Sequence, residues 1–227
     1  MPSQMEDSFH ICLLCAYSVG VDFVRPIEAI VPGAQGRMLA VLAETTAELN
    51  LRTIAQLAGV SQAQASRLLP DLVDLGVLER REVPPASLFR FVPEHVASRA
   101  LLALARSTDT VLDEIGRLAG ALLRPPVSVI VFGSFARREA DAHSDIDVVV
   151  VRPSGIDDDD DAWTDSIEAW RREVRRLTGN RVEVLEVSAG EAATKLGGRA
   201  QVWADIRRDG RVVYGTGLDQ LRSVARA

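Results

Sequence analysis

The sequence predicts an α+β protein of two domains, the second of which holds a small mixed sheet flanked by helices. Three observations lead to this fold class. Apolar residues recur at helical spacing across residues 35–75, and a hairpin pattern follows at 77–92. Strand-like apolar runs at 127–132 and 148–151 enclose a polar turn. A further run rich in β-branched residues lies at 181–187.

The composition is that of a globular protein with room for one large or two small domains. The chain has 227 residues, of which 47% are hydrophobic and 26% charged. Its net charge of −6 argues against a surface that binds nucleic acid everywhere, although a local binding site stays open. We expect a leader or arm at 1–32, a first domain at 33–93, a helical linker at 94–125, a second domain at 126–217 and a tail at 218–227.

The N-terminal segment offers little support for a metal site or a membrane anchor. Cys12 and Cys15 are the two cysteines, and a zinc site needs four ligands, so two buried apolar residues are the favoured interpretation. The absence of a disulfide framework suits the cytoplasm. The apolar run 11–19 is too short to span a membrane, and no basic stretch precedes it as in a signal peptide. We therefore expect no membrane partner.

The first domain reads as three helices and a hairpin. Helices are expected at 35–49 and 53–58, and a third begins after Ser61, a good N-cap. That helix ends at Gly76, and we expect Pro70 to kink it. Strands are expected at 77–83 and 88–92.

This order resembles a winged helix-turn-helix over residues 36–93. The resemblance implies that the helix after the Gly59 turn enters the DNA major groove and that the hairpin, or wing, contacts phosphates. Six Arg against seven Asp or Glu between Gly33 and Glu94 make a poor electrostatic footprint for DNA, so a protein-binding or dimerising module stays open. The candidate DNA-binding residues are Gln62, Gln64, Ser66, Arg67, Arg80, Arg81 and Arg90.

Two helical stretches are expected between residues 94 and 124, with a break near 107–109. Their apolar stripes suit either a linker packed on the second domain or the seam of a homodimer.

The most informative segment runs from Gly133 to Asp147. A Gly133-Ser134 turn follows a strand and precedes a short helix, which places backbone N–H groups where they could face an anion. Asp145 and Asp147 lie two residues apart at the start of the next strand, so both side chains project from one face. Adjacent carboxylates repel each other unless a cation such as Mg²⁺ lies between them. The segment therefore predicts phosphoryl or nucleotidyl transfer.

The Gly-Ser turn, the ten-residue spacing and Asp-x-Asp resemble the minimal nucleotidyltransferases of the DNA polymerase β superfamily. The match extends to Ala136, Arg137, Glu139, Ala140 and Ser144, but Arg138 stands where the family commonly has Gly. The resemblance covers roughly residues 126–217. It implies a polymerase β-like fold that transfers NMP from a nucleoside triphosphate, with ATP as the first guess, to a hydroxyl on a protein or small molecule. It also implies two Mg²⁺ ions and a nucleotide site formed by Gly133, Ser134, Phe135 and Arg137.

The family usually adds a third carboxylate from a later strand. Glu183 matches this position, and Asp145, Asp147 and Glu183 are then the catalytic and metal-binding residues. Glu186 is the competing choice, and it projects from the opposite face of the strand.

The rest of the second domain is expected to be structural. The five aspartates at 157–161 read as a solvated loop, and 163–177 as an amphipathic helix. Residues 200–217 resemble the family's closing helix and strand. A second function stays open, in which a transcriptional regulator or antitoxin-like protein uses the transferase fold as a nucleotide sensor or partner-binding arm.

Overall fold

The computed structural model describes residues 22–223, and this part of the chain forms two compact units, 22–112 and 113–223. Along the chain, the boundary between the units, after Leu112, falls within the segment 94–125 that was expected to be a linker. The cysteine pair Cys12 and Cys15, the apolar run 11–19 and most of the expected leader lie outside the described residues, as does the end of the tail. Within 22–223, no helix combines the length and the apolar character that a membrane span requires.

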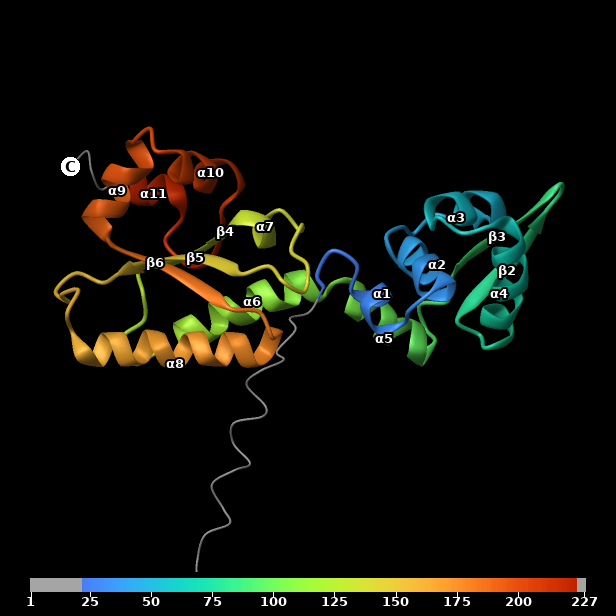
Figure 1. Cartoon of the computed structure of the whole chain (residues 1–227), viewed down its shortest axis with the longest axis horizontal. Coiled ribbons are helices and arrows are strands. Elements are labelled where there is room, and N and C mark those ends of the chain that lie inside the picture. Colours follow the sequence, from blue (N-terminus) through green and yellow to red (C-terminus); the bar gives the residue numbers. More distant parts are fainter. Residues whose placement is uncertain (1–21, 224–227) are drawn as a thin grey trace, which may run out of the picture. The chain divides into compact units, whose positions relative to one another are not determined.

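The first unit has the helix and hairpin order that the sequence predicts (Figure 1). Its three strands form an antiparallel sheet in the order β1-β3-β2. The elements are α1 (Pro26–Ile30), α2 (Ala34–Ala43), β1 (Leu49–Asn50), α3 (Leu51–Leu57), α4 (Gln62–Asp74), β2 (Leu78–Val83), β3 (Ala86–Phe91) and α5 (Val96–Ala105).

Side-chain caps fix where the two central helices begin. The Asn50 side chain accepts a hydrogen bond from Thr53 N at 2.9 Å and starts α3. Ser61 and Gln64 form a reciprocal capping box that starts α4. Helix α4 continues through Pro70 to Asp74. The core beneath these helices includes Met38, Leu42, Ile54, Leu69 and Phe89.

The first expected helix is shorter than the apolar spacing suggested. Helix α2 ends at Ala43, and Leu49 belongs to β1 instead, where it is the register partner of Phe89 in β3. A tertiary strand pairing therefore overrides the helical spacing of Leu49. The expected break near 107–109 occurs at Arg106, between α5 and α6 (Ser107–Gly120).

The second unit contains the mixed sheet that the sequence predicts. The strand order is β6-β5-β4-β7, with β5 and β6 parallel and the other pairs antiparallel. The elements are β4 (Ser128–Phe132), α7 (Gly133–Ala136), β5 (Ile146–Arg152), α8 (Asp161–Thr178), β6 (Val182–Ser188), α9 (Ala189–Gly197), α10 (Gln201–Asp209), β7 (Arg211–Gly215) and α11 (Leu218–Ser223).

Helices cover both faces of this sheet, with α8 on one side and α9, α10 and α11 on the other (Figure 1). The whole run Val148–Val151 in β5 is consequently buried, as expected for a strand covered on both faces. On one side α8 buries Trp163 and Trp170, and on the other Trp203 and Ile206 from α10 enter the core.

Helix α6 approaches strand β7 closely because two of its residues are glycines. A Cβ atom on Gly116 would lie 2.0 Å from the Val213 carbonyl oxygen, and one on Gly120 would lie 2.5 Å from the Tyr214 ring. Helix α9 was not predicted from the sequence. Ser188 and Glu191 form a capping box at its start, and this pattern could have revealed the helix.

Asp160 provides a test of how α8 is held. Its carboxylate caps α8 through Trp163 N and accepts two hydrogen bonds from Arg124, at 3.0 and 2.8 Å. The Arg124 hydrogen bonds, followed by that of Trp163 N, lower the pKa of Asp160 to about 2. Because the folded pKa lies below the unfolded value, this carboxylate stabilises the fold above about pH 4 and loses that effect as the pH falls toward 2.

We expect Asp160→Asn to lower the melting temperature at pH 7 and to leave it almost unchanged near pH 2. Fluorescence-monitored melting checks this, because all three tryptophans lie in the second unit. An equal destabilisation at both pH values would contradict the assigned role of the charge.

Candidate active site

The register between β5 and β6 brings two of the predicted site residues together. Asp147 and Glu183 are direct register partners in this parallel pair. Val151 and Val187, also register partners, point to the face covered by α9, and both lie an even number of residues from this acidic pair. Asp147 and Glu183 therefore project from the same face of the sheet.

Gly133 allows the turn between β4 and α7 to approach Asp147. Its φ of +70° lies in the left-handed region, and a Cβ atom there would lie 2.3 Å from Asp147 Oδ2. The glycine at the end of β4 therefore leaves the space that the carboxylate occupies. Ser134 and Phe135 follow in α7, and the Phe135 side chain is fully buried, so only its backbone could contact a nucleotide.

Asp147 lies in an unfavourable electrostatic environment for a carboxylate. Burial raises its pKa, and the negative charges of Asp145 and Glu183 raise it further, while Arg137 opposes them. A half-buried carboxylate beside two other carboxylates fits a site that holds a divalent cation. Hard oxygen ligands of this kind are those that Mg²⁺ prefers.

Two of the three carboxylates, Asp145 and Glu183, pair with Arg181 in this structure. Its guanidinium contacts Asp145 at 3.2 and 3.4 Å and lies 3.7 Å from Glu183 Oε1. Within residues 22–223, no three His, Cys, Asp or Glu side chains lie close enough to share one metal ion. Asp145, Asp147 and Glu183, which the sequence predicts as metal ligands, therefore do not form such a group in this structure.

The competing carboxylate, Glu186, has a different role. It accepts hydrogen bonds from Arg152 Nη1 at 2.5 Å and Trp163 Nε1 at 2.8 Å. Trp163 belongs to α8, on the face opposite to Asp147. Glu186 therefore anchors α8 to the sheet and lies away from the aspartate pair.

Asn180 anchors the loop that carries Asp145. It is buried, and its Nδ2 donates to the carbonyl oxygens of Ser144 at 2.9 Å and Asp141 at 3.3 Å. Ser144 in turn donates through Oγ to the Asp141 carboxylate at 2.9 Å. The sequence did not single out Asn180 or Arg181, because each is tied to this loop across a separation of 36 residues.

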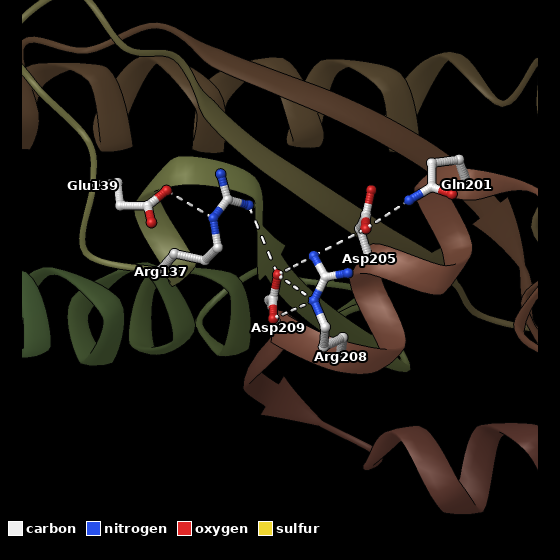
Figure 2. Close-up of polar contacts among 6 residues, drawn as sticks. All are labelled: Arg137, Glu139, Gln201, Asp205, Arg208 and Asp209. Atoms are coloured by element: carbon white, nitrogen blue, oxygen red, sulfur yellow. Dashed lines mark hydrogen bonds and ion pairs between the residues drawn. The ribbon is translucent and has the colours of Figure 1, made fainter.

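Arg137 belongs to an ion-pair network that links the end of α7 to α10 (Figure 2). Its Nε donates to Glu139 at 2.8 Å, and its Nη1 lies 3.9 Å from Asp209 Oδ2. Asp209 also accepts from Arg208 at 2.7 Å. A phosphate that binds Arg137 would compete with the carboxylates of Glu139 and Asp209 for its guanidinium.

Arg138, which stands where the resembled family commonly has Gly, adopts a backbone conformation that favours glycine. Its φ is +61°, in the left-handed region that glycine adopts without strain.

The candidate DNA-binding residues fall into two groups. Gln62, Ser66 and Arg67 are exposed on α4, whereas the Gln64 side chain is occupied in the capping box. All three wing arginines pair with glutamates: Arg80 with Glu82, Arg81 with Glu48 and Arg90 with Glu79. Arg67 on α4 has no carboxylate partner among the described residues. The positive charges of the three wing arginines, in contrast, are each balanced by a glutamate.

Two family models match separate parts of the chain. Residues 36–82 match the IclR helix-turn-helix domain, and residues 111–193 match the nucleotidyltransferase domain. These matches confirm the predicted fusion of a helix-turn-helix with a nucleotidyltransferase domain. A search of curated proteins returned no significant match.

Two solved structures of toxin–antitoxin proteins were also found. One, described as a toxin–antitoxin with AMP-PNP, is 16% identical with a TM-score of 0.35, covering 51% of this chain and 81% of its own. The other, a mutant of the toxin–antitoxin MntA-HpeT, is 14% identical with a TM-score of 0.34, covering 51% and 80%.

The contact between Gly133 and Asp147 can be tested against a matched glycine. Gly155 has a similar φ of +82°, but a Cβ atom there would meet nothing within 4 Å. We expect Gly155→Ala to cost about 1 kcal/mol of unfolding free energy, from backbone strain alone. Gly133→Ala should cost clearly more, because it also displaces the Asp147 carboxylate.

Denaturant unfolding monitored by tryptophan fluorescence measures both changes. Equal losses of unfolding free energy in the two variants would show that the close approach of Gly133 to Asp147 does not contribute to stability.

Proposed function

We propose that this fusion of an IclR-type helix-turn-helix domain with a nucleotidyltransferase domain transfers NMP from a nucleoside triphosphate, with ATP as donor, to a hydroxyl acceptor. The observation that carries the proposal is the pairing of Asp147 with Glu183 beside the Gly133 turn. Asp145, two residues before Asp147 in the sequence, is the third carboxylate of the proposed site. The acceptor hydroxyl belongs to a protein or a small molecule.

Asp145, Asp147 and Glu183 would hold Mg²⁺, with two ions the expected number. The raised pKa of Asp147 supports this, because a bound cation would offset both the burial and the carboxylate repulsion that raise it. Bound Mg²⁺ would lower the pKa of the acceptor hydroxyl and neutralise charge on the leaving pyrophosphate. Arg181 would have to leave Asp145 and Glu183 for these carboxylates to bind metal.

The reaction forms one bond and breaks one. The acceptor oxygen attacks the α-phosphorus of the triphosphate, and the bond from that phosphorus to the bridging oxygen breaks, which releases pyrophosphate. Glu183, exposed on its strand, could take the proton of the hydroxyl. The backbone of Gly133, Ser134 and Phe135 would position the triphosphate, and Arg137 would balance its charge.

The helix-turn-helix unit would bring this activity to DNA. In such domains the second helix of the motif, here α4, enters the major groove. Exposed Gln62, Ser66 and Arg67 suit base or phosphate contacts. A second candidate function, in which the chain acts as a regulator or antitoxin-like protein and uses the transferase fold as a nucleotide sensor or partner-binding arm, is favoured by this same exposed helix face. Homodimerisation would suit a symmetric operator.

Asp145 and Asp147 provide a test of the proposed activity. We expect Asp145→Ala/Asp147→Ala to reduce transfer of label from α-³²P-ATP in cell lysate by at least about a hundredfold, because the metal ligands supply several kcal/mol of transition-state stabilisation. Chelation of Mg²⁺ should have the same effect on the wild type.

Asp158→Asn/Asp159→Asn serves as the control, since it removes two exposed carboxylates from the same domain without touching the site. Undiminished labelling by the Ala variant would refute the proposed activity, and labelling lost in both variants would point to a charge effect.

Arg67 and Glu48 provide a test of the proposed DNA binding. Binding to the protein's own upstream region should weaken in Arg67→Ala, and the slope of log K against log salt should fall by about 1 if Arg67 contacts a phosphate. Glu48→Gln should strengthen binding, because it releases Arg81 from its carboxylate partner.

Electrophoretic mobility shifts across a salt series measure both changes. If neither variant alters binding, or if no sequence preference is found, the helix-turn-helix unit has another partner.

A further inference from the structure

A pocket of about 250 Å³ lies beside Glu183 and has no role in the reaction as proposed so far. It is formed by the C-terminal half of α8 and the start of β6, the edge strand of the sheet. Its charged lining consists of four arginines and two glutamates: Arg171, Arg172, Arg175, Arg181, Glu168 and Glu183. The lining thus carries two more positive than negative charges, in a chain whose net charge is −6.

Two of these arginines are already used by the fold. Arg171 donates to the Val182 carbonyl oxygen at 3.1 and 2.8 Å and to Glu168 at 2.6 Å, which holds α8 against the sheet edge. Arg181 contacts Asp145 and Glu183. Neither arginine is freely available, but both add positive potential to the pocket.

The other two arginines have no such partner. The side chains of Arg172 and Arg175 are exposed, and neither makes an ion pair or hydrogen bond within residues 22–223. They lie three residues apart, so they are neighbours on the helix surface and repel each other. By contrast, Arg176 on the same turns pairs with Glu173 at 2.9 Å and does not line the pocket. An anion in the pocket would relieve the repulsion between Arg172 and Arg175.

We propose that this pocket binds a phosphate monoester carried by the acceptor substrate. The inference rests on the proposed nucleotidyl transfer, because Glu183, at the sheet edge, lines the pocket and is also one of the proposed catalytic residues. A phosphate monoester carries between −1.5 and −2 charges near neutral pH, which matches the excess of two positive charges in the lining. Its three terminal oxygens can accept from several arginines at once, whereas one bidentate arginine satisfies a carboxylate.

The bound phosphate stays unchanged in the reaction and orients the acceptor. Fixing this group at Arg172 and Arg175 would hold a hydroxyl of the same molecule near Glu183, which takes the proton as the oxygen attacks the α-phosphorus. The source of the monoester is either a small phosphorylated polyol or the terminal phosphate of a nucleic acid.

The test measures binding of ribose 5-phosphate, with ribose as the neutral comparison, by calorimetry on the full chain. Mg²⁺ and a non-hydrolysable ATP analogue fill the donor site. We expect Arg172→Gln/Arg175→Gln to weaken ribose 5-phosphate binding by about tenfold or more, since charge-assisted hydrogen bonds are lost. Arg176→Gln should leave binding within about twofold of wild type, although it removes a charge from the same helix.

A short oligonucleotide with a 5′-phosphate, compared with its unphosphorylated form, separates the two sources. Binding that is insensitive to Arg172→Gln/Arg175→Gln overturns the proposal, as does an equal loss in Arg176→Gln, which would indicate diffuse charge attraction. Equal binding of an acidic peptide would overturn the preference for phosphate. Tryptophan fluorescence verifies that each variant is folded.

Release of pyrophosphate from ATP separates this inference from the proposed function. If wild type releases pyrophosphate but binds ribose 5-phosphate no better than ribose, the acceptor subsite is wrong and the transfer stands. If binding depends on Arg172 and Arg175 but no pyrophosphate is released with any acceptor, the pocket binds phosphate and the transfer assignment fails.

Discussion

The parallel pairing of β5 with β6 is the constraint on which the candidate site depends. It alone places Asp147 opposite Glu183, although 36 residues separate them in the chain. Because side chains alternate along a strand, a slip of one residue would replace Glu183 by a valine on that face. The helix between the two strands, α8, is attached to β6 at two points. Trp163 reaches Glu186 from one end of α8, and Arg171 binds the Val182 carbonyl oxygen nearer the other.

Charge compensation by arginine explains much of the remaining architecture. Arg124, Arg152 and the wing arginines each face a carboxylate, so they stabilise local structure and contribute little field to a ligand. Only 26 basic residues oppose 32 acidic ones in the chain, so an arginine without a partner is informative. Arg67 on α4 and the pair Arg172 and Arg175 on α8 have no carboxylate partner among the described residues, and the same is true of Arg52, Arg99 and Arg199. We propose an anion contact for the first three because of their positions, on the second helix of the motif and in the pocket beside Glu183.

Periodicity and turn chemistry were sufficient for the fold class, because every central strand is a short apolar run and most helices carry clear stripes. The choice between Glu183 and Glu186 needed more. Alternation shows that the two residues face opposite sides, but only the pairing of β5 with β6 shows which side carries Asp147. The sequence identifies Gly133 as a turn residue. Its close approach to the Asp147 carboxylate, fourteen positions later, depends on tertiary structure and could not be read from the sequence. Arg181 and Asn180 were missed for the same reason, since their partners lie far away in sequence.

The two connections of α8 differ in length, and this has an evolutionary consequence. The chain crosses from β5 to α8 through residues 153–160, an exposed aspartate-rich loop, but returns from α8 to β6 through residues 179–181 alone. Gly179 ends the helix in a left-handed conformation, and the next two residues hold the Asp145 loop. Homologous chains should therefore vary in length within the first connection. An insertion or deletion in the second connection would shift Glu183 out of register with Asp147. The number of residues between α8 and Glu183 should therefore be constant among homologues that keep this acidic pair.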